Sequence, residues 1–448
     1  MDMIRMKAGK FGHRVFFIVW LSYFSVVSAF AQQPSSKISK QDRDQVLAML
    51  DSISADVKKH YYDAKLHGID WDANIKNFRE KIVNASSLNR GLSEVAAAVD
   101  VLNDSHTFFI PPPRPYKHDF GWQIAMVGQK CLVLRVRPQN DAENKGIRRG
   151  DQVLAINGFI PGRDNLWKLD YIFNILRPQP ALHISLLSPS GENKNVELIA
   201  AMRALPKMTD LTGEGIFDYI RKLEYQEELG RMRYVETDDD LMILKFPEFA
   251  FTQFEVDSMM RKARKHKTLI IDLRGNPGGS VVTLNEFLGN LFDHDVKICD
   301  RVTRDNSKPQ LAKSRKQNAF GGTLIVLVDS KSASASEVLA RVVQIERRGT
   351  VLGDKSAGAV MEARHYPYHN GFETIVPYAA SITEADLVMT DGRSLEHVGV
   401  LPDVLLVPTA SDLAAGLDMV MARAVVLGGG KMTPEAANQL FPYEWPKD

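Results

Sequence analysis

The sequence predicts a multidomain α/β protein. Its C-terminal half carries short, continuous apolar runs of the kind found in buried parallel strands, and helical stretches alternate with them. These runs are Leu241–Leu244, Thr268–Ile271, Thr323–Val328 and Thr350–Leu352. The chain has 448 residues, 44% of them hydrophobic, so it can bury more than one core. We therefore expect several domains with an α/β layer among them.

The net charge and the spacing of potential metal ligands limit the kinds of ligand and partner that we expect. The formal net charge is +1 and no long basic stripe occurs, so we do not expect nucleic acid as a partner. No His, Cys and Asp residues stand at metal-ligand spacing, so neither a metal nor another cofactor is expected. Cys131 and Cys299 fall in different predicted domains, and we expect them to be unpaired and buried, although an exported protein could form a disulfide.

The N-terminus has the pattern of a secretory signal. Residues 15–27 are apolar, and Ala29-Phe30-Ala31 fits a small-residue cleavage site before Gln32. The basic residues that precede the apolar run are Arg5, Lys7, Lys10 and Arg14. The run is short for a membrane span. We expect residues 1–31 to be removed and the mature protein to be periplasmic or secreted, without a stable membrane anchor.

A helical region is predicted for residues 37–113. Apolar residues recur there at helical spacing, and three prolines at 111–113 end the pattern. Asn103-Asp104-Ser105-His106-Thr107 closes it. A lone histidine beside an apolar run is usually a core residue, so this segment alone does not indicate chemistry.

Residues 116–204 show strand patterns instead. Trp122–Val127 and Cys131–Val136 are apolar runs of strand length, and Asn157-Gly158 is a strong signal for a two-residue hairpin turn. We expect a β-rich domain. After Pro408 the pattern is helical again, and residues 410–448 are expected to pack back on the core through their Met and Leu positions.

Two loops of the C-terminal half follow predicted strands. The segment 272–279 contains three glycines, which can adopt positive φ and direct bare N–H groups at an anion. A tight strand-to-helix turn is the plainer interpretation. Residues 395–403 form a second loop, which carries Glu396 towards a short strand or is an ordinary surface turn.

The segment 332–337 places serines between an apolar strand and an amphipathic helix. A serine there can act as a nucleophile whose oxyanion meets the first amides of the helix. The alternative is a capping box, in which Ser334 and Glu337 only stabilise the helix start.

These segments, in this order, resemble the tail-specific or C-terminal processing serine peptidases and their tricorn-like relatives. Residues 206–409 would then form the peptidase core, with a ClpP/crotonase-like layered sheet. Residues 116–204 resemble a PDZ domain, because Gly150-Asp151 leads into an apolar strand that ends in Asn157-Gly158. PDZ domains bind extended peptides at a sheet edge. Here Phe120-Gly121-Trp122 matches the start of the loop that captures a terminal carboxylate, although a purely structural PDZ domain remains the alternative.

The resemblance also implies site residues. In the processing branch the nucleophile would be Ser334, but the position of the basic lysine is occupied by Ala359, and Lys355 could replace it only in a rearranged loop. The tricorn-like branch uses a Ser-His pair and a glutamate, which match Ser105, His106 and Glu396.

In the tricorn-like arrangement, the resemblance makes His106 the general base for Ser334, with Ser105 and Glu396 as its orienting partners. The backbone N–H groups of Ala335 and of Gly278 or Gly279 would hold the oxyanion.

The expected function is an exported serine endopeptidase acting on proteins or peptides, with the PDZ domain engaging substrate C-termini. One alternative is a serine–lysine mechanism that uses Lys355. The other is a catalytically inactive peptide- or lipophile-binding protein on the same fold.

Overall fold

The computed structural model describes residues 38–204, 231–371 and 376–445, and these belong to one compact unit. The predicted signal segment 1–31 lies outside the described residues, as do 206–230 of the predicted core and 446–448 of the predicted tail. Within the described ranges, no helix is long and apolar enough to cross a membrane.

The N-terminal part is helical, as predicted, but its helices end earlier than expected. Helices α1 (Lys40–His60), α2 (Trp71–Val83) and α3 (Leu88–Asp100), with a short 3-10 turn η1 (Leu66–Gly68), bury one apolar cluster. Each α-helix begins at a capping side chain that accepts a backbone N–H, and the three caps are Ser39, Asp70 and Ser87. Residues 108–110, predicted inside the helical region, instead form strand β1 (Phe108–Ile110).

The β-rich segment folds as an antiparallel sheet in the order β3-β4-β5-β6-β7. Its strands are β3 (Trp122–Val127), β4 (Lys130–Val136), β5 (Gln152–Ile156), β6 (Ala181–Leu187) and β7 (Asn193–Ile199). Three short helical segments accompany the sheet, α4 (Asp141–Asn144), α5 (Leu166–Asp170) and η2 (Tyr171–Leu176), and β2 (Tyr116–Asp119) pairs with β8 (Ala201–Ala204). Asn157 and Gly158 have φ of 49° and 82°, which confirms the predicted hairpin turn.

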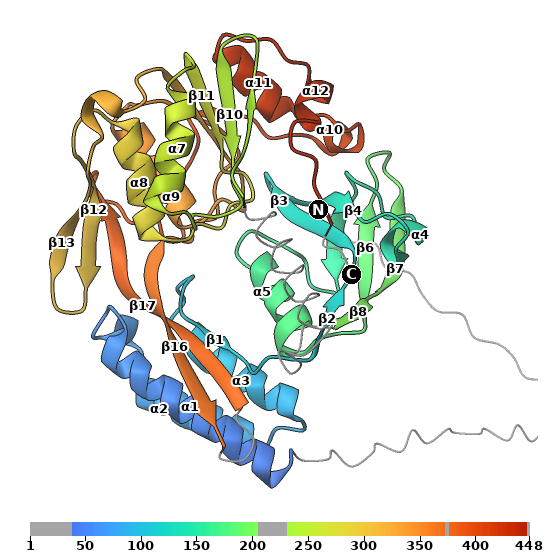
Figure 1. The fold of residues 1–448 in the computed structure, drawn as a ribbon. Helices are drawn as coiled ribbons and strands as arrows, with labels where there is room; N and C mark the ends of the chain where they lie inside the picture. The colour runs from blue at the N-terminus through green and yellow to red at the C-terminus, as the bar shows by residue number, and fades with distance from the viewer. Residues whose placement is uncertain (1–37, 205–230, 372–375, 446–448) are drawn as a thin grey trace, which may run out of the picture. The chain divides into compact units, whose positions relative to one another are not determined.

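The central sheet has the order β18-β15-β14-β11-β10-β9 (Figure 1). The four predicted strands are confirmed as β10 (Leu241–Lys245), β11 (Thr268–Asp272), β14 (Thr323–Val328) and β15 (Thr350–Gly353). They run parallel to one another and to β18 (Val404–Leu405), whereas β9 (Arg233–Glu236) is antiparallel. The carboxyl ends of these parallel strands meet at one edge, so the loops after β11, β14 and β15 converge there.

Both faces of this sheet are covered. Helices α7 (Gln253–Ala263), α8 (Val281–Leu291) and α9 (Ala335–Ile345) pack on the face that carries Met242 and Leu244. The tail helix α11 (Met419–Leu427) packs on the other face against Leu241 and Ile243, beside α10 (Ala410–Ala414) and α12 (Pro434–Asn438). Met421 is buried in that cluster, as expected of a packing residue.

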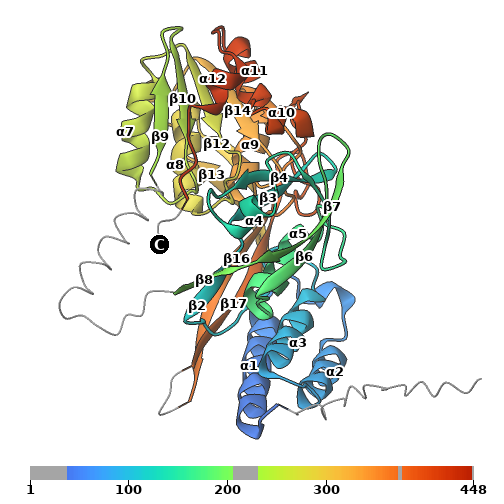
Figure 2. The same cartoon turned by 90° about the vertical axis from the view of Figure 1, so that its right-hand side faces the viewer.

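A second sheet, absent from the sequence-based expectation, joins the helical region to the core. It has the order β1-β17-β12-β13, with β16 on β17, and its further strands are β12 (Val296–Thr303), β13 (Ser307–Ala312), β16 (Met361–Asn370) and β17 (Val376–Met389). Strand β17 buries Ala380 and Ile382 against the N-terminal helices and Met389 in the central core (Figure 2). The predicted boundary at residue 113 therefore does not separate two independent cores.

Both cysteines are free and buried, which confirms the expectation from the sequence. Burial raises the pKa of each thiol to about 12, so neither is a reactive thiolate at neutral pH.

Candidate active site

Ser334 occupies the sharp turn between β14 and α9. Its φ of 54° and ψ of −119° are unusual for a residue with a side chain, so surrounding contacts must hold the turn. Its N–H donates to the carbonyl oxygen of Ala359 at 2.8 Å and lies 3.1 Å from Oε2 of Glu337. The strained serine is thus fastened to the loop after β15.

Glu337 is the centre of this fastening. Its side chain is fully buried, and its carboxylate also accepts bonds from Oγ of Ser356 at 2.6 Å and from the N–H groups of Gly358 and Ala359 at 2.7 and 2.9 Å. Burial raises its pKa even though all four bonds favour the charged form. The helix-cap interpretation accounts for only one of these bonds, because the other three reach a different loop.

Ser105, His106 and Glu396 come together although Ser105 and Glu396 are 291 residues apart in sequence. Nδ1 of His106 lies 2.7 Å from Oγ of Ser105, which donates to Oε2 of Glu396 at 2.9 Å. The N–H of Ser105 donates to Oε1 of Glu396 at 2.6 Å. We call these three residues the relay.

The proton positions in the relay follow from the number of donors. The hydroxyl of Ser105 has one proton, which it gives to Glu396, so it accepts from Nδ1–H of His106. In this tautomer, Nε2 of the neutral ring is left as the proton acceptor. Burial lowers the pKa of His106, Asp104 acts in the opposite direction, and His365 lowers it further.

One peptide group connects the relay to the turn that carries Ser334. The carbonyl oxygen of Ala359 accepts from Ser334, and the N–H of the same peptide unit, that of Val360, donates to Oε2 of Glu396 at 2.8 Å. The side chain of Ala359 is only a methyl group, so these two bonds are made by the main chain of residues 359 and 360. Lys355, the alternative base, is held through its own carbonyl, which accepts from Arg163.

The two candidate oxyanion glycines differ in position. A Cβ added at Gly278 would lie 2.6 Å from Cβ of Ser334 and 2.9 Å from N of Ala335, whereas one at Gly279 would meet the backbone of Phe249. Gly278 is therefore the glycine that faces Ser334 and the first residue of α9. Its N–H donates to Oδ1 of Asn276 at 2.8 Å, so it must exchange this partner to bind an oxyanion.

The Phe120-Gly121-Trp122 segment is already hydrogen-bonded within the protein. The N–H of Gly121 donates to Oδ1 of Asp119 at 2.8 Å, and the carbonyl oxygens of Phe120 and Gly121 accept from Nδ2 of Asn140. Trp122 begins the edge strand β3. A carboxylate could bind the Gly121 N–H only by displacing Asp119.

Sequence reasoning missed three residues that shape the site. Asp104 accepts the N–H groups of His106 and Thr107 and the hydroxyl of Thr383 on one oxygen, Oδ1. Asn276 holds the loop of Gly278, and Val360 holds Glu396. Val360 acts through its main-chain N–H, which leaves no residue-type signal, whereas Asn276 acts through its side-chain amide. In the described ranges, no group of three or more His, Cys, Asp or Glu side chains could hold a metal ion.

Family models match the region that contains Ser334 and Glu396, but neither matched range includes Ser105 or His106. Residues 240–406 match peptidase family S41, and residues 42–89 match the tricorn protease C1 domain. A tricorn protease homolog of Streptomyces coelicolor is 24% identical over 400 residues, covering 83% of this chain and 31% of that protein. The carboxy-terminal processing protease CtpA of Bacillus subtilis is 23% identical over 295 residues, covering 63% of this chain and 55% of that protein.

The fold has solved counterparts. The structure of mature CPAF is similar with a TM-score of 0.63 at 15% identity, covering 84% of this chain and 94% of that one. The photosystem II D1 C-terminal processing protease gives a TM-score of 0.50 at 17% identity, covering 82% and 97%. These matches confirm the predicted fold class. The chain spans about a third to a half of the length of the sequence relatives named above.

Replacing Glu337 by Gln tests whether its carboxylate holds the two loops together. The amide NH2 group would face N–H donors, so we expect the free energy of unfolding to fall by about 3 kcal/mol, measured by urea denaturation. Glu346→Gln, at the exposed end of the same helix, is the matched control and should change it by less than about 0.5 kcal/mol. Equal stability of the two variants would contradict the role given to Glu337.

Proposed function

We propose that this chain, whose residues 240–406 match peptidase family S41, is a serine endopeptidase that hydrolyses proteins or peptides. The observation that supports it best is the hydrogen-bonded relay, which leaves Nε2 of His106 as a proton acceptor. The names of the sequence relatives, which are tricorn and carboxy-terminal processing proteases, support the same class of reaction.

In the proposed reaction, Nε2 of His106 takes the proton of Ser334 as Oγ attacks the substrate carbonyl carbon. The carbonyl π electrons move to oxygen, and the oxyanion is held by the N–H groups of Gly278 and Ala335. Collapse breaks the C–N bond, and the imidazolium gives its proton to the leaving amine. Water then attacks the acyl-enzyme with the same base and releases the acid and Ser334.

The relay acts on His106 in two ways. The bond from Nδ1–H to Ser105 fixes the tautomer, and the negative charge of Glu396, reached through the Ser105 hydroxyl, stabilises the imidazolium. The serine–lysine alternative requires Lys355 to reach Ser334 in place of His106. The inactive alternative keeps the fold as a peptide- or lipophile-binding protein without acylation of Ser334.

The β-rich domain and the N-terminus complete the proposal. Strand β3 is an edge of its sheet, which fits the addition of an extended substrate C-terminus in the manner of a PDZ domain. The basic and apolar pattern of residues 1–31 supports export and removal of a signal peptide.

Covalent labelling of the purified protein with a fluorophosphonate probe tests the nucleophile and the base together. We expect labelling of the wild type, none of Ser334→Ala, and at least about a hundredfold slower labelling of His106→Ala, because unassisted serine is a weak nucleophile. Lys355→Ala should label at the wild-type rate. Loss of labelling in Lys355→Ala but not in His106→Ala would favour the serine–lysine mechanism, and an unlabelled, folded wild type would favour the binding protein.

The pH dependence of labelling reports the protonation of His106. Because its pKa is lowered and only the neutral ring accepts a proton, the rate should fall as the pH drops through a midpoint below 6.5. His365→Gln removes a neighbour that lowers this pKa, so its midpoint should move upward towards 6.5. A midpoint well above neutral, unaffected by His365→Gln, would indicate a different base.

Export predicts a defined mature N-terminus. When the full chain is expressed in a bacterium with a secretion pathway, mass spectrometry of the exported protein should show a chain that begins at Gln32. Replacing both Ala29 and Ala31 by bulky residues should leave the signal uncleaved. A cell-retained chain with an intact N-terminus in the unmodified protein would refute the proposal.

A further inference from the structure

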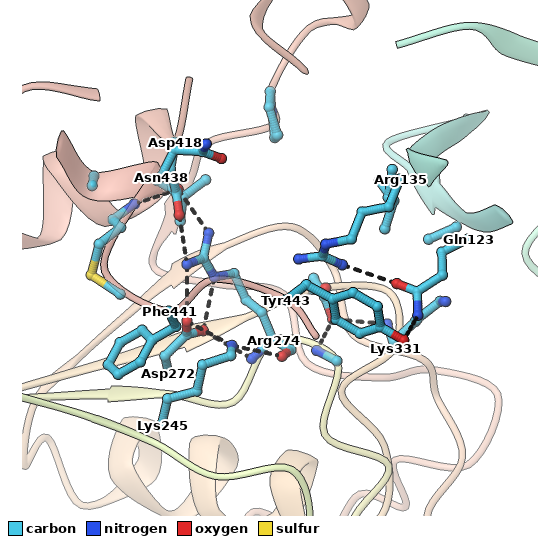
Figure 3. Close-up of a pocket in the computed structure, with 18 of the residues that line it drawn as sticks. Gln123, Arg135, Lys245, Asp272, Arg274, Lys331, Asp418, Asn438, Phe441 and Tyr443 are labelled. Atoms are coloured by element: carbon cyan, nitrogen blue, oxygen red, sulfur yellow. Dashed lines mark hydrogen bonds and ion pairs between the residues drawn. The ribbon is translucent and has the colours of Figure 1, made fainter. Parts of the chain in front are cut away.

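A large cavity lies beside the catalytic loops, between strands β3 and β4, the carboxyl ends of the central strands and the C-terminal helices (Figure 3). Its volume is about 740 Å³. Its lining includes Lys331, Asp329 and Gly275, but none of the relay residues, Ser334 or Gly278. It is therefore a space distinct from the proposed catalytic centre, on the same two loops.

One set of charges in the cavity wall is balanced. Arg274 contacts both Asp272 and Asp418 at 2.8 Å, and Nζ of Lys245 lies 2.8 Å from Asp272. The two cations and two carboxylates neutralise one another, and their dashed contacts are visible in Figure 3. This network has a structural role, because it joins β10 and β11 to the start of α11.

Five further cations line the cavity, Arg231 and Arg233 among them, and the other three have no carboxylate partner among the described residues. Arg135 donates to the amide oxygen of Gln123 and Arg149 to that of Asn438. Nε of Arg149 is buried without an acceptor. No described carboxylate lies at salt-bridge distance from Arg135, Arg149 or Lys331.

The remaining acids of the wall form no ion pair with these three cations among the described residues. Oδ1 of Asp329 accepts the N–H groups of Gly275 and Lys331, and its charge acts on Arg135 and Lys331 without salt-bridge contact. Asp354 pairs with Arg163 at 2.6 Å, and Glu444 also lines the cavity. The three cations therefore lack a direct carboxylate partner in the described part of the chain.

The environment of these cations disfavours their charge. Burial lowers the pKa of Arg135, Arg149 and Lys331, and the charges of Asp329 and Asp418 oppose this lowering only in part. The side chains of Arg135 and Lys331 are nevertheless solvent-exposed, which is the combination expected of groups that open into a cavity. Three like charges that face one cavity repel one another, and a bound anion would relieve this repulsion.

We propose that this cavity binds a small organic anion carrying two or more closely spaced negative charges, contacted by Arg135, Arg149 and Lys331. Polycarboxylates and phosphate esters share this chemistry. Apolar side chains complete the wall and suit the organic part of such a ligand. They include Met126, Leu134, Phe246, Leu413 and Phe441.

The site adjoins the nucleophile through short covalent and hydrogen-bonded paths. Lys331 precedes Ser334 by three residues, and Asp329 bonds to Gly275 on the loop that carries Gly278. A ligand on Lys331 would thus bias both loops that build the oxyanion site. This effector role rests on the proposed peptidase function, whereas anion binding itself does not.

Calorimetric titration of the purified protein with sodium pyrophosphate, and separately with citrate, tests the binding site. Ionic strength is held constant, and acetate serves as the singly charged control. We expect saturable binding of at least one polyanion and none of acetate. Binding of pyrophosphate alone would identify a phosphoryl ligand, and binding of citrate alone a polycarboxylate. Absence of binding for both anions at millimolar concentration would overturn the proposal.

Charge-removing variants locate the binding. Lys331→Met and Arg149→Met should each weaken the polyanion affinity about tenfold or more, because a charge-assisted hydrogen bond is lost. Lys130→Met, at the exposed first residue of β4 and outside the cavity lining, is the matched control and should bind as the wild type does. Unchanged affinity in both cavity variants would overturn the assignment.

Thermal melting without ligand separates a binding role from a structural one. Since the cations of the cavity wall repel one another without a bound anion, both cavity variants should melt at or above the wild-type temperature. A clear fall in both would mean that the cations serve the fold, which refutes the proposal.

The effector role is read from the rate of fluorophosphonate labelling with and without the bound polyanion. The effector role is supported if the polyanion changes the labelling rate of the wild type at least about threefold and leaves that of Lys331→Met unchanged. An unchanged wild-type rate would overturn the effector role. Binding in a protein that never labels would leave the anion site standing and count against the peptidase proposal alone.

Discussion

The buried carboxylate of Glu337 is the interaction on which the candidate site depends. Ser334 adopts a backbone conformation that costs free energy for any residue with a Cβ, and such strain persists only where surrounding contacts over-determine it. Glu337 supplies those contacts by binding the N–H of Ser334 and three donors of residues 356–359. One side chain therefore fixes the serine and the loop that reaches Glu396.

The features that could be predicted from the sequence are those that depend on neighbouring residues, namely apolar strands and tight turns. Strands β10, β11, β14 and β15 each carry a continuous apolar run because a parallel sheet is covered on both faces, and these runs identified them. The Asn157-Gly158 turn followed from the need for positive φ at both positions. Parallel strands also bring their loops to one edge, and that rule placed Ser334 near the glycine loop.

What remained hidden depends on contacts between distant segments. Strand β1 has three residues and forms only by pairing with β17, with Phe109 opposite Ala380. No local pattern distinguishes such a strand from the end of a helix. Likewise, Glu337 has the spacing of a helix cap in sequence, and its further partners at 356–359 belong to another loop. The exchange of partners that Gly278 requires is a property of the folded loop.

The replacement of a lysine position by Ala359 has a structural consequence beyond the choice of base. A base on the loop after β15 would lie in the same domain as Ser334, whereas His106 belongs to the segment that follows the N-terminal helices. Its position is therefore set by the pairing of β1 with β17 and by the bonds of Asp104 and Thr107 to Thr383. Any change that frees β1 from β17 would displace His106 relative to Ser334 while leaving both sequence motifs intact. In the proposed mechanism, catalysis thus depends on the docking of the N-terminal helices through the second sheet.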